Sequence, residues 1–293
     1  MSVSLKSIPV FYTPAMVAPS LSFSPSSMKP EKVVAAWQTL GIPIEVIEPK
    51  PATVDEFALA HDRAFVERVL AGEADNGFSN RDMAIARTLP YTSGSMRDAA
   101  FAALENRAVA ISPTSGFHHA HWKMASGYCT FNGLMVAARC LLTSGKAKRV
   151  GVIDCDYHYG NGTDDIIAKL KITHEIKHFT QGELFSTRSR EKVHDFFDVL
   201  EKQLHVMADC DVILYQAGAD PHINDPLGGF LTTSHLRDRD LLVFKECHKR
   251  GIPVAWNLAG GYQQLASTGE TDWAALTEIH SNTLKACWSV FGR

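Results

Sequence analysis

Strand-like runs alternate with helix-like stretches along this chain, and this alternation constrains its fold more than any other feature. Seven runs rich in β-branched residues are typical of buried strands: 8–12, 42–47, 108–111, 150–154, 172–178, 212–216 and 253–258. Amphipathic stretches at helical spacing lie between them, at 31–40, 54–71, 94–106, 130–143, 163–170, 190–208, 234–250 and 272–288. The alternation predicts an α/β fold, a parallel sheet with helices on both faces.

Length alone does not decide the number of domains, because 293 residues suit one large domain or two small ones. The polar, turn-rich segment 72–93 is the candidate linker. The strands after it need partners from before it to complete a sheet, so we predict a long surface loop instead. We therefore expect a single domain over residues 1–293.

Composition and charge exclude several classes of partner. The chain is 45% hydrophobic and 21% charged, as soluble globular proteins are. A net charge of −3 gives no general attraction to nucleic acid or anionic membranes. The longest apolar helix candidate, 134–142, is too short to span a bilayer. We expect no nucleic-acid or membrane partner, while an oligomer is compatible with the sequence.

The cysteines and the N-terminus indicate a cytoplasmic protein. The six cysteines form no CxxC pair, and several lie in hydrophobic runs, as buried reduced thiols do. Pro9, Pro14 and Pro19 interrupt the first apolar stretches, so we expect no signal peptide.

Three side chains that can bind a metal lie at and just after the end of the strand predicted at 150–154. Asp154, Asp156 and His158 alternate along the chain. Alternate side chains of an extended segment share one face, so these three groups are predicted to point the same way.

A second polar run, after the sixth predicted strand, contains Asp220, His222 and Asp225. Loops at the carboxyl ends of parallel strands converge, so Asp225 can join Asp156 and His158 in one metal site. Two carboxylates and one imidazole suit a catalytic Zn²⁺ that keeps a further position for water. The roles of Asp220 and His222 stay open, because either side chain could instead only stabilise the loop.

The adjacent pair His118 and His119 follows another strand-like run. Hydrolysis at a metal needs a base that takes a proton from water, and imidazole has a suitable pKa. Asp154 and Asn161 are candidates to accept hydrogen bonds from the two rings and fix their tautomers.

The last strand-like run ends at Gly260, Gly261 and Tyr262. Glycines let the backbone pass close to a bulky group, so we expect both to lie beside the substrate. Tyr262 is either a packed aromatic or, at the mouth of the crevice, a hydroxyl that donates to a developing oxyanion.

In sequence order, these segments resemble the histone deacetylase and acetylpolyamine amidohydrolase superfamily, which has an arginase-like α/β fold. Members carry a His-His pair, a DxDxH run, a GxD…DP loop and a GGY turn. The similarity covers roughly residues 100–265, and the combination is specific although each piece alone is weak.

The resemblance implies a role for each site residue. The zinc ligands would be Asp156, His158 and Asp225. His118 and His119 would be the paired catalytic histidines, with His119 the general base, and Tyr262 would polarise the substrate carbonyl.

Other residues would support these groups. Asp154 would hold His118 and help to bind a structural K⁺. Gly127 and Tyr128 match the family's Gly-aromatic-Cys element, whose ring walls the acyl-lysine tunnel. Asn161 replaces an Asp of some members, so it lends His119 a hydrogen bond without charge.

Three departures from the family pattern concern substrate identity. The His-Pro-Glu-Arg run near the N-terminus is replaced by residues 27–32. The tunnel loop after residue 179 is short and passes through Phe185 to Arg190. The rim acid that grips the substrate has no clear counterpart, and Asp75 is the candidate.

We therefore expect a zinc-dependent amidohydrolase that removes acetyl or a related acyl group from an amine. Its substrate would be a small molecule or an acyl-lysine peptide, and Fe²⁺ could replace Zn²⁺. One alternative is an arginase-like binuclear ureohydrolase, for which the sequence offers too few bridging carboxylates. The other is an acyl-ligand or metal-binding module without turnover.

Overall fold

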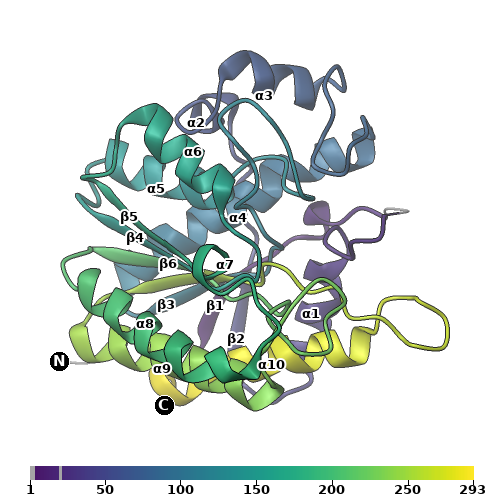
Figure 1. Ribbon diagram of the computed structural model, residues 1–293. Coiled ribbons are helices and arrows are strands. Elements are labelled where there is room, and N and C mark those ends of the chain that lie inside the picture. The colour runs from purple at the N-terminus through teal and green to yellow at the C-terminus, as the bar shows by residue number, and fades with distance from the viewer. Residues whose placement is uncertain (1–3, 20–21) are drawn as a thin grey trace.

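The computed structural model describes residues 4–19 and 22–293, and the seven strands of this part form one sheet. The strands are β1 Ile8–Phe11, β2 Ile44–Ile47, β3 Val109–Ser112, β4 Val150–Asp154, β5 Ile176–Thr180, β6 Val212–Gln216 and β7 Val254–Asn257. They lie in the order β2-β1-β3-β7-β6-β4-β5, and all neighbours are parallel (Figure 1).

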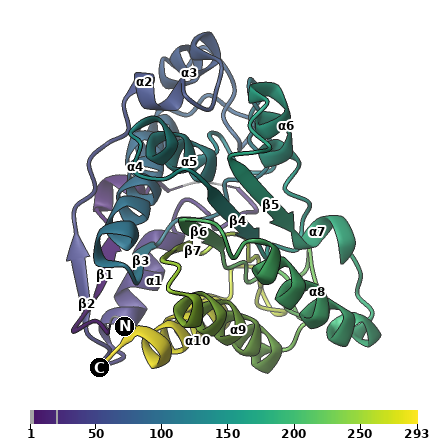
Figure 2. The same ribbon diagram turned by 90° about the vertical axis from the view of Figure 1, so that its left-hand side faces the viewer.

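Two groups of helices cover the two faces of the sheet (Figure 2). One face carries α2 Val54–Phe57, α3 Arg63–Leu70, α4 Met83–Asn106, α5 Gly133–Thr143 and α6 Asn161–Leu170. The other carries α1 Lys29–Gln38, α8 Val193–Val206, α9 Thr233–Arg250 and α10 Trp273–Phe291. Each group encloses its own hydrophobic cluster. The predicted parallel sheet with helices on both faces is confirmed.

The four central strands end in polar residues that lie side by side. Ser112 of β3 pairs with Asn257 of β7, which also pairs with Gln216 of β6. Gln216 in turn pairs with Asp154 of β4. Every residue of β4 and β6 is buried, as expected for strands covered on both faces. The sheet therefore has an apolar body and a polar carboxyl edge.

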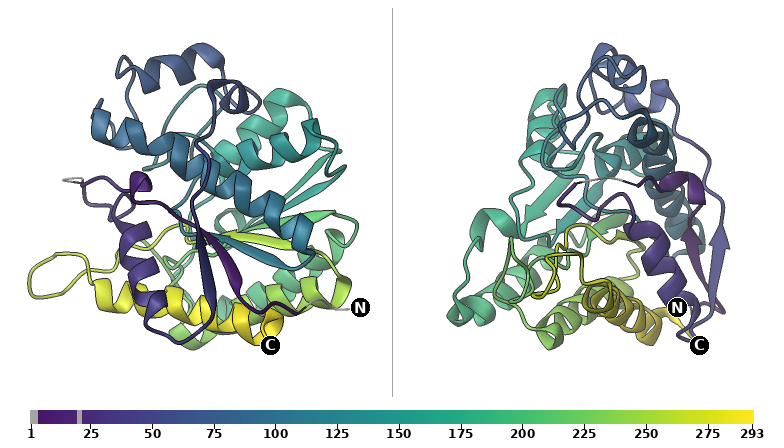
Figure 3. Two further views of the ribbon diagram at one scale, coloured as in Figure 1. Left: turned by 180° about the vertical axis from the view of Figure 1, so that it is seen from behind. Right: turned by 90° about the vertical axis from the view of Figure 1, so that its right-hand side faces the viewer.

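The prediction that residues 72–93 form a long loop is wrong, because α4 already begins at Met83 and crosses β1, β3 and β7 (Figure 3). A proline normally breaks a helix, since it has no N–H and clashes with the preceding turn. Beside Pro90 a tertiary contact ties the helix to a distant segment: the Ala52 N–H donates to the Pro90 carbonyl at 2.8 Å. Gly94 makes room for this segment, because a Cβ there would overlap the backbone beside Ala52.

Two other predicted boundaries differ from the structure. The stretch 54–71 is two helices, because the Asp62 carboxylate accepts the Phe65 N–H at 3.0 Å and caps α3 as a new helix. The strand predicted at 172–178 is β5, which starts later, since the Ile172 N–H completes the end of α6 instead.

All six cysteines are buried and free, as predicted. Burial raises the pKa of each thiol, so the cysteines stay protonated at neutral pH. No helix of the described residues is long and apolar enough to cross a membrane.

Candidate active site

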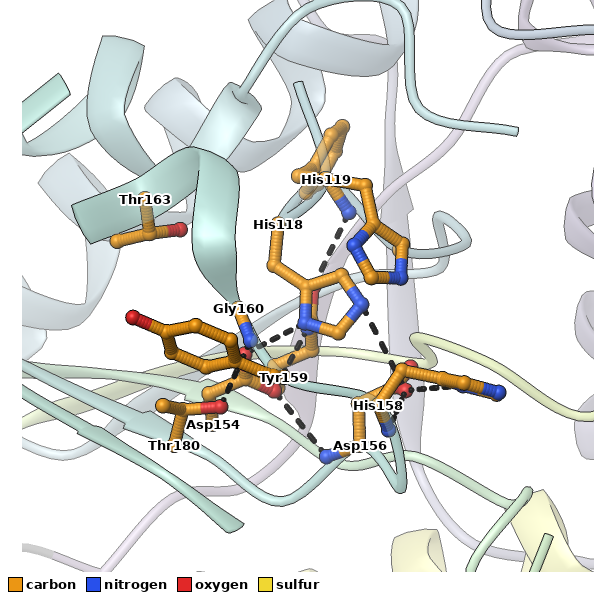
Figure 4. Close-up of polar contacts among 12 residues, drawn as sticks. His118, His119, Asp154, Asp156, His158, Tyr159, Gly160, Thr163 and Thr180 are labelled. Atoms are coloured by element: carbon orange, nitrogen blue, oxygen red, sulfur yellow. Dashed lines mark hydrogen bonds and ion pairs between the residues drawn. The ribbon is translucent and has the colours of Figure 1, made fainter. Parts of the chain in front are cut away.

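The predicted site residues lie on four loops that follow four adjacent strands. These loops include 118–119 after β3, 155–158 after β4, 220–225 after β6 and 260–262 after β7, and Asp154 is the last residue of β4 itself. Because the strands are parallel neighbours, the loops meet at the carboxyl edge of the sheet. Figure 4 shows the rings of His118 and His119 above Asp154, Asp156 and His158.

Asp156, His158 and Asp220 form a cluster in which one donor atom of each lies within 4.8 Å of the others. Nδ1 of His158 lies 2.9 Å from Oδ2 of Asp220 and 3.2 Å from Oδ1 of Asp156. Both carboxylates are buried. Two buried carboxylates and an imidazole are a donor set that suits Zn²⁺.

Asp225, the predicted third ligand, lies beside this cluster but outside it. Its Oδ2 accepts the Tyr262 N–H at 2.7 Å, and its Oδ1 accepts the Leu227 N–H at 3.0 Å. Burial raises the pKa of Asp225 to about 6, although these two N–H groups lower it. Asp220 thus joins Asp225 as a candidate for the third ligand.

The charges in the cluster depend on each other. Burial and the neighbouring Asp156 raise the pKa of Asp220 to about 8. The pKa of Asp156 lies well below its usual range, because His118 and His158 outweigh the effect of burial. Burial lowers the pKa of His158, but Asp156 and Asp220 outweigh it and raise that pKa to about 11. Buried carboxylates this close attract positive charge, which a divalent cation would supply.

His118 is held by the carboxylate of Asp154. Its Nδ1 lies 2.7 Å from Oδ2 of Asp154, so Nδ1 carries the proton and donates it. The other oxygen of Asp154 accepts the Gln216 side-chain N–H at 2.8 Å. Burial lowers the pKa of His118, but Asp154 and Asp156 outweigh it and raise the pKa to about 9. The ring is therefore protonated at neutral pH.

His119 has a different environment. Its Nδ1 lies 2.8 Å from Oδ1 of Asn161, which only accepts, so Nδ1 carries the proton and Nε2 has a free lone pair. Burial and the neighbouring His118 lower the pKa of His119 to about 4. Gly127 packs against this ring with φ +52°, and a Cβ there would lie 2.5 Å from His119 Cδ2. The neutral His119 is thus positioned to accept a proton.

Tyr262 lies at the edge of the cluster and is 8% exposed. Its ring centroid lies 6.3 Å from that of His158 and 6.0 Å from that of Tyr128. Burial, and after it the charge of Asp156, raises the pKa of Tyr262 well above its usual value. The phenol therefore keeps its proton and can donate a hydrogen bond.

Gly260 and Gly261 bring the Tyr262 loop onto the carboxylates and the core. The Gly260 N–H donates to Oδ2 of Asp156 at 2.8 Å, and a Cβ on Gly260 would crowd both Asp156 and Asp220. Gly261 has φ +141°, and a Cβ there would overlap Leu276. The structure thus explains both glycines by packing and hydrogen bonding within the protein.

The sequence model of the histone deacetylase domain matches residues 26–185, more than half of the chain. The chain belongs to the histone deacetylase family. An uncharacterised protein of Picosynechococcus sp. is 30% identical over 192 residues, 61% of this chain and 63% of that protein. Histone deacetylase 14, chloroplastic, of Arabidopsis thaliana is 26% identical over 281 residues, 80% of this chain and 66% of that protein. The chain thus spans about two thirds of the length of these relatives.

Solved structures confirm the deacetylase-like fold. An acetylpolyamine aminohydrolase from Burkholderia pseudomallei superimposes with a TM-score of 0.77, covering 97% of this chain and 99% of that one. The two sequences are 17% identical, so this likeness concerns the fold.

Lys29 is a site residue that sequence reasoning missed. It lies in the segment that replaces the family's His-Pro-Glu-Arg run, and it is fully buried. Its Nζ donates to the carbonyl of Ala259 at 2.7 Å, directly before the Gly-Gly turn. Burial lowers the pKa of Lys29 to about 8, while Asp220 and Asp156 raise it. One feature of the sequence could have pointed to Lys29. It is a charged residue directly before Pro30, in the segment that replaces a family motif.

The structure also describes the two segments considered for the rim. Asp75 pairs with Arg81 at 2.8 Å, and both side chains are largely exposed. The segment after β5 begins with the short helix α7 Gln181–Leu184, and Phe185 turns into the core against Phe196 and Phe230. Phe185 is therefore a core residue of this short segment.

His61, on the other side of the histidine pair, ties the following loop to α5. Its Nδ1–H donates to the His121 carbonyl at 2.9 Å, and its Nε2 accepts the Asn132 N–H at 2.8 Å. The contact in which Nε2 accepts requires a neutral ring, with its proton on Nδ1. Burial lowers the pKa of His61 to about 4, against the effect of its backbone partners.

We expect His61 to make the fold sensitive to acid. A histidine whose pKa is lower in the folded state than in the unfolded state stabilises the fold fully above pH 6.5 and loses this contribution as the pH falls toward 4. Between pH 7.5 and pH 5 this loss is about 2 kcal/mol. Urea unfolding measures the free energy of unfolding at both pH values. The difference between the two values should be smaller for His61→Gln than for the unchanged protein. His194→Gln, at an exposed position, is the control, and equal differences in all three proteins would contradict this role.

Proposed function

We propose that this chain is a zinc-dependent amidohydrolase that removes acetyl or a related acyl group from an amine. The observation that carries the proposal is the position of two histidines with different hydrogen-bond partners, Asp154 for His118 and Asn161 for His119, beside the cluster of Asp156, His158 and Asp220. Nε2 of His118 lies 3.6 Å from Oδ1 of Asp156, and the His119 ring centroid lies 5.9 Å from that of His158. The names of the similar proteins, histone deacetylase and acetylpolyamine aminohydrolase, support the same reaction class.

The metal would be held by Asp156, His158 and one further carboxylate, Asp220 or Asp225. When bound, Zn²⁺ supplies a Lewis acid that polarises a carbonyl and lowers the pKa of water. A single domain over residues 1–293 is part of this proposal. Its support is that the strands of the described residues join one sheet, whose central strands all contribute to the site.

The residues of the chain would handle the protons of the hydrolysis. His119 accepts a proton from the attacking water at Nε2, because Nδ1 is engaged by Asn161. The water oxygen bonds to the carbonyl carbon, and the Tyr262 hydroxyl donates to the carbonyl oxygen as it gains negative charge. The C–N bond then breaks, and the protonated His118 supplies the proton for the leaving nitrogen. The proton that His119 took from water is then passed to His118 through solvent, which restores both rings. One water is consumed, and a carboxylic acid and an amine are formed.

Acetate release from a panel of acetyl-lysine peptides, acetylpolyamines and acetylated alkylamines tests the proposal directly. We expect release from at least one class by the zinc-loaded protein and none after chelation. No hydrolysis of any acyl amide at full zinc occupancy would favour the binding-module alternative.

The variant Tyr262→Phe tests the oxyanion donor. We expect kcat to fall by about 10²–10³, because the lost hydrogen bond acts on charge that develops during the reaction. The melting temperature and the metal content should barely change, since only one hydroxyl is removed.

Tyr159→Phe is the matched control, because the Tyr159 hydroxyl bonds to Asp164 at the surface. It should keep its kcat within a few-fold. A stable, metal-loaded Tyr262→Phe enzyme with normal kcat would reduce Tyr262 to a packed aromatic.

A further inference from the structure

We propose that this site selects acyl amides whose amine part is uncharged and apolar, and that it discriminates against acylated polyamines. This inference rests on the proposed amidohydrolase function and names the substrate class of the same site. It comes from the side chains at the mouth of the site, beyond the reacting groups.

A row of aromatic rings crosses the mouth. Phe23 stacks on Tyr262 with 6.1 Å between ring centroids and 22° between ring planes. Tyr262 neighbours Tyr128 at 6.0 Å, and Tyr128 neighbours Phe78 at 5.6 Å. Phe23 is 44% exposed, so the row is open to solvent at this end. Since Tyr262 belongs to both the row and the site, a substrate reaches the site along these rings.

Exposed leucines extend this apolar surface on the loops that carry the site. Leu227 lies two residues after Asp225 and is 38% exposed, and Leu265 lies on the segment after Tyr262 and is 40% exposed. Leu184 of α7 is also exposed, and α7 packs closely on the His158 backbone at Gly182. Apolar groups of a substrate would be removed from water here, which is favourable.

Most of the acids named near the mouth are already engaged by other side chains. Asp164 accepts the Tyr159 hydroxyl at 2.7 Å and is also engaged by His178 at 2.7 Å. Asp75 is paired with Arg81. Glu183 of α7 remains as an exposed acid beside Leu184.

Arg188 places a positive charge beside the loop of Asp225. Its Nη2 donates to the carbonyl of Pro226, next to Asp225, at 2.9 Å. Within residues 4–19 and 22–293, no carboxylate oxygen lies within 4 Å of its guanidinium. A cationic amine entering here would lose hydration against apolar side chains and meet a like charge. An alkyl group of the same size would gain from the same surroundings.

A matched pair of substrates tests the inference. N-pentylacetamide and N-acetylputrescine have nearly the same length, and a methyl group in the first replaces the ammonium group of the second. We expect kcat/KM of the zinc-loaded protein at low ionic strength to be at least about tenfold higher for N-pentylacetamide. The arginine supplies part of this ratio, so Arg188→Glu should reduce it several-fold.

Arg190→Glu makes the same charge change two residues away on the exposed surface, and it should leave the ratio close to that of the unchanged protein. A preference for N-acetylputrescine, or equal ratios in the Arg188→Glu and Arg190→Glu variants, would overturn the selectivity while leaving the hydrolase activity intact. Failure to hydrolyse both compounds and an acetyl-lysine peptide would overturn the proposed function itself.

Discussion

Replacing Asp156 by alanine is expected to abolish metal retention and amide hydrolysis together. Asp156 lies at the centre of the candidate site, where its Oδ1 is 3.2 Å from Nδ1 of His158 and its Oδ2 accepts the Gly260 N–H at 2.8 Å. Loss of a group that only supports a ligand typically lowers metal affinity by about 10–100-fold, so loss of a ligand itself should cost more. Metal analysis of the dialysed variant, with circular dichroism to verify folding, measures this.

The same experiment identifies the third ligand and the number of ions. Asp220→Asn and Asp225→Asn should differ in their metal content after dialysis. The carboxylate whose replacement releases the metal is the third ligand. Asp75→Ala, at the surface, should keep the ion. Stoichiometric metal in dialysed Asp156→Ala would show that the assignment is wrong, and two ions per unchanged chain would favour the arginase-like alternative.

Replacing His119 by alanine is expected to lower kcat by about 10²–10⁴ while the metal is retained. The reason is the free lone pair on Nε2, which the Asn161 hydrogen bond at Nδ1 preserves. Among the residues that the structure describes, the clustered donor groups are Asp156, His158 and Asp220, and His119 is not one of them. We therefore expect the ion to stay bound without the His119 ring.

His121→Ala is the control on the same loop, because His121 is directed at Asp165 on the surface. We expect it to keep most of its turnover. Rates measured at saturating substrate with equal metal content separate the two variants, and unchanged turnover in His119→Ala would rule out the proposed base.

The parts of the site that follow local rules were predictable from the sequence. Asp154 ends β4 and Asp156 follows two residues later, so strand periodicity sets both side chains relative to the sheet. The tautomers of His118 and His119 follow from partners that the sequence analysis named, Asp154 and Asn161. These contacts form because the strands before them end at the same edge of the sheet. The apolar runs in the sequence mark these strands and therefore their ends.

Other parts depend on contacts that no local pattern contains. Lys29 donates to Ala259, which is 230 positions away in the chain. Helix α4 continues through Pro90, where Ala52 of a distant segment donates to the Pro90 carbonyl. The position of Asp220 inside the cluster depends on how its loop turns after β6, and turn geometry overrides spacing there. Sequence reasoning had no means of deriving these three features.

The order of strands in the sheet also bears on how the protein folds. β3 lies beside β7, so Val109 pairs with Val254, and the site is complete only after such distant segments have joined. Closing long loops is slow, and the candidate metal centre would therefore form late in folding. A fragment ending at residue 185 would retain His118 and His119 with Asp156 and His158, but would lack Asp220 and Asp225. A bound ion would stabilise only the fully assembled sheet, by about 2.7 kcal/mol at a hundred times its Kd.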